Sequence, residues 1–181
     1  HMGALGPKRI LMSPKGFQLP QPYRYVDNPH TWLPFTDMVF IDPVSTGYSR
    51  AEQGVKRAKF HGLNEDIASV GEFVKLYVSR NERWLSPKFL CGESYGTTRA
   101  AGLAGHLQDR YGMFIQGVVL VSAVMDFQTA RFTSSNDAPP ALFLPTYTAS
   151  AWYHKKLKGK YAEDLEKTLK DHVVSCLPGI E

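Results

Sequence analysis

Residues 88–122, KFLCGESYGTTRAAGLAGHLQDRYGMFIQGVVLVS, decide the fold class of this chain. The apolar run at 88–91 is predicted to be a short strand, and residues 115–122 are predicted to be a second, buried strand. Between them, residues 97–111 are rich in alanine and glycine and have the pattern of a helix. A strand, a helix and a second strand in this order predict a parallel pair, because parallel neighbours need a crossover connection.

The sequence before this stretch extends the alternation. Residues 37–41 (DMVFI) form an apolar run typical of buried strands, and residues 64–84 predict a helix with Asn64 as its N-cap. The apolar positions of that helix are Ile67, Val70, Phe73, Val74, Tyr77 and Val78. Weaker patterns at 9–12 and 23–26 predict short strands. Together these segments predict an α/β protein with a mainly parallel sheet and flanking helices.

The pattern changes after the second strand. Residues 126–145 hold several prolines and are predicted to be a long loop. Residues 146–157 and 161–174 are predicted to be helices. No further strand is predicted there, so the last part of the chain is expected to be a helical appendage to the core.

Composition and pattern together predict the organisation of the chain. Hydrophobic residues make up 43% of the 181 residues and charged residues 21%, which is typical of a globular protein. No apolar run reaches the roughly 18 residues that a membrane span needs. A chain of this length is expected to form one domain with one core, and residues 1–2 are interpreted as an expression remnant.

Charge and cysteine usage exclude several classes of function. The net charge is +4, and the lysines at 155–160 predict a solvated helix end rather than a nucleic-acid surface. Cys91 and Cys176 allow one disulfide at most, and Cys91 is expected to be buried and inert. No cysteine–histidine spacing predicts a metal site, so neither a metal nor a cofactor is expected.

Gly92-x-Ser94-x-Gly96 has the pattern of a nucleophile elbow, a tight turn between a strand and a helix. Such a turn exposes the serine hydroxyl, and its glycines keep the neighbouring backbone from clashing. Ser94 is therefore the candidate nucleophile, and the backbone N–H of Tyr95 the candidate oxyanion donor. A glycine-rich turn with only a structural role is the alternative.

A serine nucleophile needs a base and an orienting acid. The histidines that follow Ser94 are His106, His154 and His172. His106 lies on the helix of the elbow itself and points along it, whereas His154 and His172 fall in the helical appendage and fit surface or packing roles. Asp126 follows a predicted strand and is the best acid by position. The residues thus predict a nucleophile without a convincing base.

Three segments resemble the serine carboxypeptidases of the α/β-hydrolase fold. Residues 92–96 (GESYG) match the motif around their nucleophile. Residues 37–50 (DMVFIDPVSTGYSR) are similar to the segment upstream of it in bacterial members. Residues 144–154 (LPTYTASAWYH) are similar to the start of their helical insertion. The order and spacing of the three segments agree with that family.

The resemblance implies a peptide substrate and no cofactor. Ser94 would attack the last peptide bond, and Glu93 would help to bind the C-terminal carboxylate of the substrate. Two carboxyl groups so close cannot both ionise cheaply, so Glu93 would act in its protonated form and favour an acidic working pH. An extracytoplasmic location is also expected from the resemblance.

The chain departs from the family pattern in two ways. The Asn-Gly-Gly-Pro-Gly segment expected just before Gly3 is missing, and no acid stands at Gly3–Ala4, where many members have a second glutamate. The acid and base of the triad would lie beyond Glu181. These departures predict a central fragment without peptidase activity. The fragment would hold a partial α/β-hydrolase core over 3–125 and a loop with the start of the helical insertion over 126–181. Its exposed sheet edges favour self-association.

Two other functions are compatible with the same residues. A complete small serine esterase would use Ser94 with His154 or His172 as its base. A non-catalytic binding module would keep a hydrolase fold without turnover.

Overall fold

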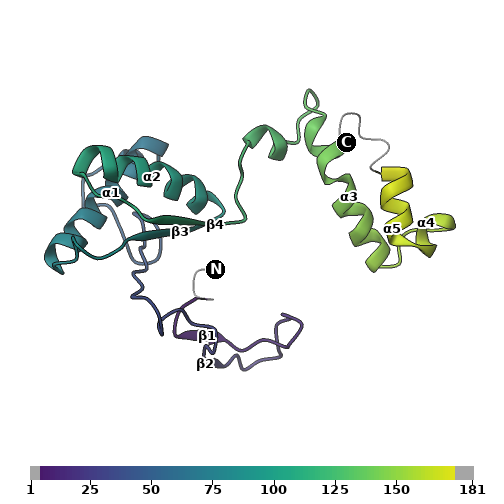
Figure 1. The fold of residues 1–181 in the computed structure, drawn as a ribbon, viewed down its shortest axis with the longest axis horizontal. Helices are drawn as coiled ribbons and strands as arrows, with labels where there is room; N and C mark the ends of the chain where they lie inside the picture. The colour runs from purple at the N-terminus through teal and green to yellow at the C-terminus, as the bar shows by residue number, and fades with distance from the viewer. Residues whose placement is uncertain (1–4, 174–181) are drawn as a thin grey trace. The chain divides into compact units, whose positions relative to one another are not determined.

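The computed structural model describes residues 5–173 of the chain, which divides into two compact units, residues 1–123 and 124–181. The elements of the first unit are β1 (Lys8–Ile10), β2 (Tyr25–Asp27), η2 (Arg57–Phe60), α1 (Leu63–Arg80), β3 (Phe89–Glu93), α2 (Tyr95–Tyr111) and β4 (Gly117–Val121) (Figure 1). Those of the second are η3 (Phe127–Ala130), α3 (Ala138–Tyr153), α4 (Lys160–Glu163), α5 (Leu165–Thr168) and η4 (Leu169–Val173).

The centre of the first unit is β3, α2 and β4. The two strands are parallel, with Phe89 opposite Gly117 at one end of the ladder and Glu93 opposite Val121 at the other. Helix α2 connects them, and α1 and α2 lie on the same side of the two strands (Figure 1). The strand–helix–strand prediction for residues 88–122 is therefore confirmed, and the fold is of the α/β class.

Helix α1 supplies one half of the core. Its Ile67, Val70 and Val78 are buried and pack against Leu103 and Leu107 of α2. The predicted apolar face is narrower than expected, because Phe73 and Tyr77 are 42% and 37% exposed. The N-cap is Gly62 rather than Asn64, so the helix begins earlier than predicted, and it ends at Arg80 rather than residue 84.

Glycines let α1 and α2 approach closely. A Cβ on Gly71 of α1 would lie 2.7 Å from Cδ2 of His106, and one on Gly102 of α2 would lie 2.4 Å from Cδ1 of Ile67. Side chains of the opposite helix fill the space that a methyl group would need. Gly102 of α2 and Gly71 of α1 thus serve the contact between the two helices.

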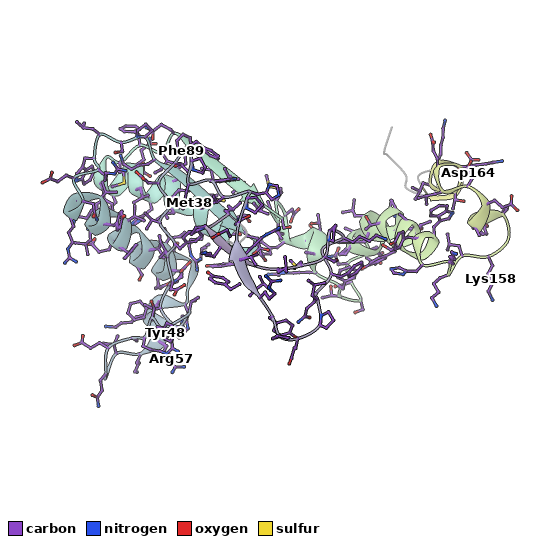
Figure 2. The ribbon with its side chains drawn as sticks, turned by 90° about the horizontal axis from the view of Figure 1, so that it is seen from below. Met38, Tyr48, Arg57, Phe89, Lys158 and Asp164 are labelled. Atoms are coloured by element: carbon purple, nitrogen blue, oxygen red, sulfur yellow. The ribbon has the colours of Figure 1, made fainter. Side chains whose placement is uncertain are left out.

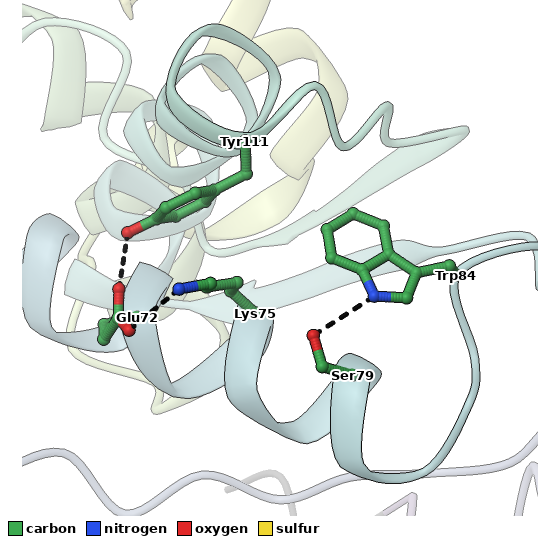
Figure 3. Close-up of polar contacts among 5 residues, drawn as sticks. All are labelled: Glu72, Lys75, Ser79, Trp84 and Tyr111. Atoms are coloured by element: carbon green, nitrogen blue, oxygen red, sulfur yellow. Dashed lines mark hydrogen bonds and ion pairs between the residues drawn. The ribbon is translucent and has the colours of Figure 1, made fainter.

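Polar contacts connect the two helices at the far end of α2 and close the end of α1 (Figure 3). The Tyr111 hydroxyl donates to Oε2 of Glu72 at 2.8 Å, and Lys75 Nζ donates to Oε1 at 3.3 Å. These contacts lower the pKa of Glu72, with the Tyr111 hydrogen bond the largest cause. The same bond raises the pKa of Tyr111. Further along, Trp84 Nε1 donates to Ser79 Oγ at 3.1 Å.

Residues 37–41 do not form the predicted strand. They have no regular secondary structure, and Val39 and Phe40 are 45% and 49% exposed. Ile41 nevertheless packs against the core, and Asp37 forms an ion pair with Arg83. An apolar run becomes a strand only where a ladder partner accepts its backbone hydrogen bonds, and no described strand pairs with this one.

Strand β4 is less buried than predicted. Its Val118, Leu120 and Val121 are each 40–42% exposed, and Phe89 of β3 is 64% exposed (Figure 2). Parallel strands are buried when helices cover both faces of their sheet. Within the described residues, α2 contacts both strands from one face only.

The first residues form a small hairpin. Strands β1 and β2 are antiparallel, with Lys8 opposite Asp27 and Ile10 opposite Tyr25. Lys8 and Asp27 also form an ion pair. The two short strands predicted from the weak patterns are therefore present, each shifted by one or two residues.

The second unit is helical, but its helices differ from those predicted. Helix α3 begins inside the predicted loop because Pro139 and Pro140 occupy its first turn, where their missing N–H groups cost no hydrogen bond. The helix predicted over 161–174 is interrupted at Asp164, whose φ of −140° and ψ of 114° are extended. Residue 174 and Cys176 lie outside the described residues.

Candidate active site

The candidate site is the turn between β3 and α2, residues 92–96, called the elbow below. Ser94 stands between the last residue of the strand and the first of the helix, with φ 54° and ψ −122°. This backbone conformation is strained for any residue other than glycine and costs about 1–3 kcal/mol. The Ser94 N–H donates to the Val121 carbonyl oxygen at 3.0 Å, so the end of β4 holds the turn in place.

The two glycines of the motif have different roles. A Cβ on Gly92 would lie 1.9 Å from the carbonyl oxygen of Gly96 and 2.8 Å from the Thr97 nitrogen. Only glycine therefore fits at position 92. A Cβ on Gly96 would meet no atom within 4 Å, so the prediction that both glycines prevent a clash is wrong for Gly96.

The first turn of α2 places hydrogen-bond donors beside Ser94. The Thr97 hydroxyl and the Thr97 N–H both donate to the Ser94 carbonyl oxygen, at 2.6 and 2.9 Å, and close the turn. Tyr95 is the first helical residue, and its N–H has no acceptor within its own helix. The positive end of the helix dipole also lies there. This end of α2 is therefore suited to a developing negative charge.

A buried carboxylate holds this first turn from the side of α1. Asp66 accepts from Arg99 Nε at 2.7 Å, from the second Arg99 nitrogen at 3.0 Å and from the Tyr95 hydroxyl at 3.2 Å. The Arg99 guanidinium also lies over the Tyr95 ring, 5.2 Å from its centroid. Asp66 is not among the residues that the sequence singles out, and nothing in its local pattern predicts its burial. The signal was the spacing of Tyr95 and Arg99, which share one face of α2.

A family model of serine carboxypeptidases matches residues 5–180. The chain belongs to the serine carboxypeptidase family. No curated protein matches the chain. The resemblance carried by the elbow and its two companion segments is confirmed at the level of the family, whose fold is the α/β hydrolase. The family assigns the chain to the serine peptidases, a class of hydrolase.

The structure groups three of the residues predicted for this carboxypeptidase-family site. Glu93 is the half-buried last residue of β3, directly before Ser94 and Tyr95. Beside them in β3, Cys91 is half-buried rather than fully buried, and burial raises the pKa of its thiol. A thiol that stays protonated is a poor nucleophile.

Two histidines of the first unit, His61 and His106, have described side-chain contacts. His106 packs edge-on against Tyr111, with ring centroids 5.7 Å apart, and its Nε2 is buried without a partner. Helical rise puts it about 18 Å from Ser94 along α2. His61 Nε2 lies 3.1 Å from Ser45 Oγ. As expected, His106 is not placed to act as the base.

The other predicted acid and base residues belong to the second unit. Asp126 caps η3, where its Oδ1 accepts the Gln128 N–H at 2.8 Å. His154 follows α3 and packs edge-on against Tyr153, with ring centroids 5.0 Å apart. His172 lies in η4. The structure therefore gives Asp126 a local capping role.

Across residues 5–173, no group of three or more histidine, cysteine, aspartate or glutamate side chains could hold a metal ion. In the same part of the chain, no helix is long and apolar enough to cross a membrane.

Proposed function

We propose that Ser94 is the nucleophile of a serine carboxypeptidase reaction. Its oxygen attacks the carbonyl carbon of the last peptide bond, the C-terminal residue leaves as an amine that takes up the serine proton, and water then hydrolyses the acyl-enzyme. The observation that carries the proposal is the strained Ser94 backbone, φ 54°, at the carboxyl end of a parallel strand and the start of a helix.

The neighbours of Ser94 are proposed to stabilise and bind the substrate. The Tyr95 N–H, at the positive end of α2, would donate to the oxyanion of the tetrahedral intermediate. Glu93 would help to bind the terminal carboxylate of the peptide. Its position directly before the nucleophile, at the end of β3, supports that role.

His106 is not proposed as the base, because it lies about 18 Å from Ser94 along α2, too far to take the serine proton. A peptide substrate and an extracytoplasmic location complete the proposal, since both are typical of the family.

A fluorophosphonate probe tests the nucleophile. We expect labelling of Ser94 in the full-length protein, and a loss of peptidase activity of about 10⁴–10⁶-fold in Ser94→Ala. Ser122→Ala is the matched control, because Ser122 also follows a parallel strand and has a φ of 54°. It should keep both labelling and activity. Labelling that persists in Ser94→Ala would overturn the assignment.

The choice of substrate distinguishes the carboxypeptidase function from the esterase function. A carboxypeptidase releases the last residue of a peptide with a free carboxylate and spares the same peptide as its C-terminal amide. Hydrolysis of simple esters without peptide cleavage, lost in His154→Ala or His172→Ala, would favour the esterase. Tight peptide binding without labelling of Ser94 would favour a non-catalytic module.

A further inference from the structure

The contact between α1 and the first turn of α2 is more buried and better paired than the other ion pairs of the described residues. The side chains of Asp66 and Arg99 are 7% and 25% exposed, whereas the other three ion pairs, Lys8–Asp27, Lys75–Glu72 and Arg83–Asp37, have both partners at least 39% exposed. A buried charge is tolerated only where it is paired and hydrogen-bonded. The three donors to Asp66 meet that requirement.

This contact constrains the turn that carries the oxyanion donor. Tyr95 and Arg99 are four residues apart on α2, so both donate from one face of the beginning of this helix. A single carboxylate on α1 therefore limits both rotation and sliding of that turn. The Tyr95 N–H belongs to the same residue as the anchored phenol, which leaves little freedom between the anchor and the donor.

We propose that Asp66 and Arg99 are positioning residues for the oxyanion donor, acting through the Tyr95 side chain on the Tyr95 backbone N–H. The inference rests on the proposed function of Ser94. Oxyanion donors stabilise a transition state only when they are held at the place where charge develops, and small displacements there are costly. The Asp66–Arg99 pair, which joins α1 to α2, supplies that rigidity from outside the reacting atoms.

The chemistry of the Tyr95 hydroxyl agrees with an anchoring role. Burial raises the pKa of Tyr95, and the negative charge of Asp66 and the hydrogen bond to it act in the same direction. The phenol thus stays protonated and donates to Asp66. The Arg99 guanidinium over its ring adds a second restraint on the same side chain.

A matched pair of variants tests the proposal in the full-length protein. Tyr95→Phe removes the hydroxyl that donates to Asp66 and keeps the backbone N–H. Tyr111→Phe removes a tyrosine hydroxyl that donates to Glu72, also between α2 and α1, about 24 Å further along the helix. We expect Tyr95→Phe to lower kcat about tenfold with KM within about twofold, because a donor is displaced rather than removed. Tyr111→Phe should leave both constants within about twofold.

A double-mutant cycle separates positioning from substrate contact. If the hydroxyl acts only through Asp66, Asp66→Asn and Tyr95→Phe together should lower kcat no further than Asp66→Asn alone. Arg99→Lys, which keeps the charge but loses the fork of two donors, should also lower kcat, with KM unchanged. If Asp66→Asn does not fold, the kcat of Arg99→Lys tests the positioning role instead.

The outcomes distinguish this inference from the proposed function. A wild-type protein in which Ser94 is neither labelled nor active would overturn both. A labelled and active wild type in which Tyr95→Phe and Tyr111→Phe have equal kcat values would overturn the inference alone. So would additive losses in the cycle, since they would place the Tyr95 hydroxyl on the substrate.

Discussion

At the residue scale, the elbow depends on the absence of a Cβ at Gly92. The carbonyl oxygen of Gly96 occupies the place where a Cβ of residue 92 would stand. Because that oxygen belongs to the first turn of α2, it cannot move without displacing the helix that follows Ser94. The strain at Ser94 and the tight contact at Gly92 are therefore two parts of one turn.

Gly92→Ala should destabilise the protein by about 3 kcal/mol, because its Cβ meets backbone rather than a flexible side chain. Gly105→Ala is the matched control, since Gly105 lies within α2 and a Cβ there meets nothing within 4 Å. It should stabilise the helix by about 0.5–1 kcal/mol. Urea denaturation measures both. A Gly92→Ala variant as stable as the wild type would contradict the steric reading of the motif.

Part of the candidate site could be predicted from the sequence. The spacing of Gly92, Ser94 and Gly96 is local, and it predicted a turn that the structure contains. Asp66 could not be predicted in the same way, because its burial depends on Arg99, which lies 33 residues away in the chain. Solvated acids and buried, paired acids look alike in a helix's first turn.

At the element scale, the contact between α1 and α2 has a different character at each end. Asp66 is buried near the elbow, whereas Glu72 is exposed at the other end of the contact and pairs with Tyr111 and Lys75. The exposed end contributes to the stability of the folded protein in a way that depends on pH, because the pKa of Glu72 is lowered in the folded protein.

The sign of that dependence follows from the direction of the shift. A lowered pKa means that the folded state favours the Glu72 carboxylate, so its contribution is complete above the usual value of 4.5 and is lost as pH falls below it. Glu72→Gln should therefore be less stable than wild type at pH 7, and the difference should shrink below about pH 4.5. Urea denaturation over that range measures it.

A Tyr111→Phe background provides the control, since the Tyr111 hydroxyl is the largest cause of the shift. In that background, Glu72→Gln should change stability less at neutral pH. An equal effect in both backgrounds would assign the shift to Lys75 or to other charges instead.

Helices and strands could be predicted from the sequence where their pattern is local. They could not be predicted where their formation depends on a partner segment elsewhere in the chain. In the strand–helix–strand unit over 88–122, the two strands pair with each other and the helix connects them. The local patterns are therefore enough to predict the unit. The run at 37–41 has the composition of a strand but no described ladder partner. In the second unit, prolines were read as loop residues, although Pro139 and Pro140 start α3.

At the scale of the whole molecule, the described β3–β4 sheet has two strands, each with one neighbour. Its apolar side chains remain partly exposed, with Val119 at 39% and Phe89 at 64%. Exposed edges and apolar faces favour pairing with another chain. We therefore propose self-association of the 181-residue chain through these strands.

Analytical ultracentrifugation of the 181-residue chain tests this proposal. The average mass should rise with concentration, and Val119→Lys on β4 should reduce the rise, because a charge on an edge strand opposes pairing. Leu85→Lys is the control, since Leu85 is fully exposed but lies outside the strands. Equal behaviour of the two variants, or a monomer at every concentration, would contradict the proposal.

The hydrogen bond from the Ser94 N–H to the Val121 carbonyl also bears on the order of folding. The partners are 27 residues apart in the chain, and the bond forms only when β3 and β4 have met in register. A long-range contact of this kind forms after the local helices. We expect amide exchange to show α2 protected earlier than Ser94 during refolding, so that the reactive serine reaches its final conformation late.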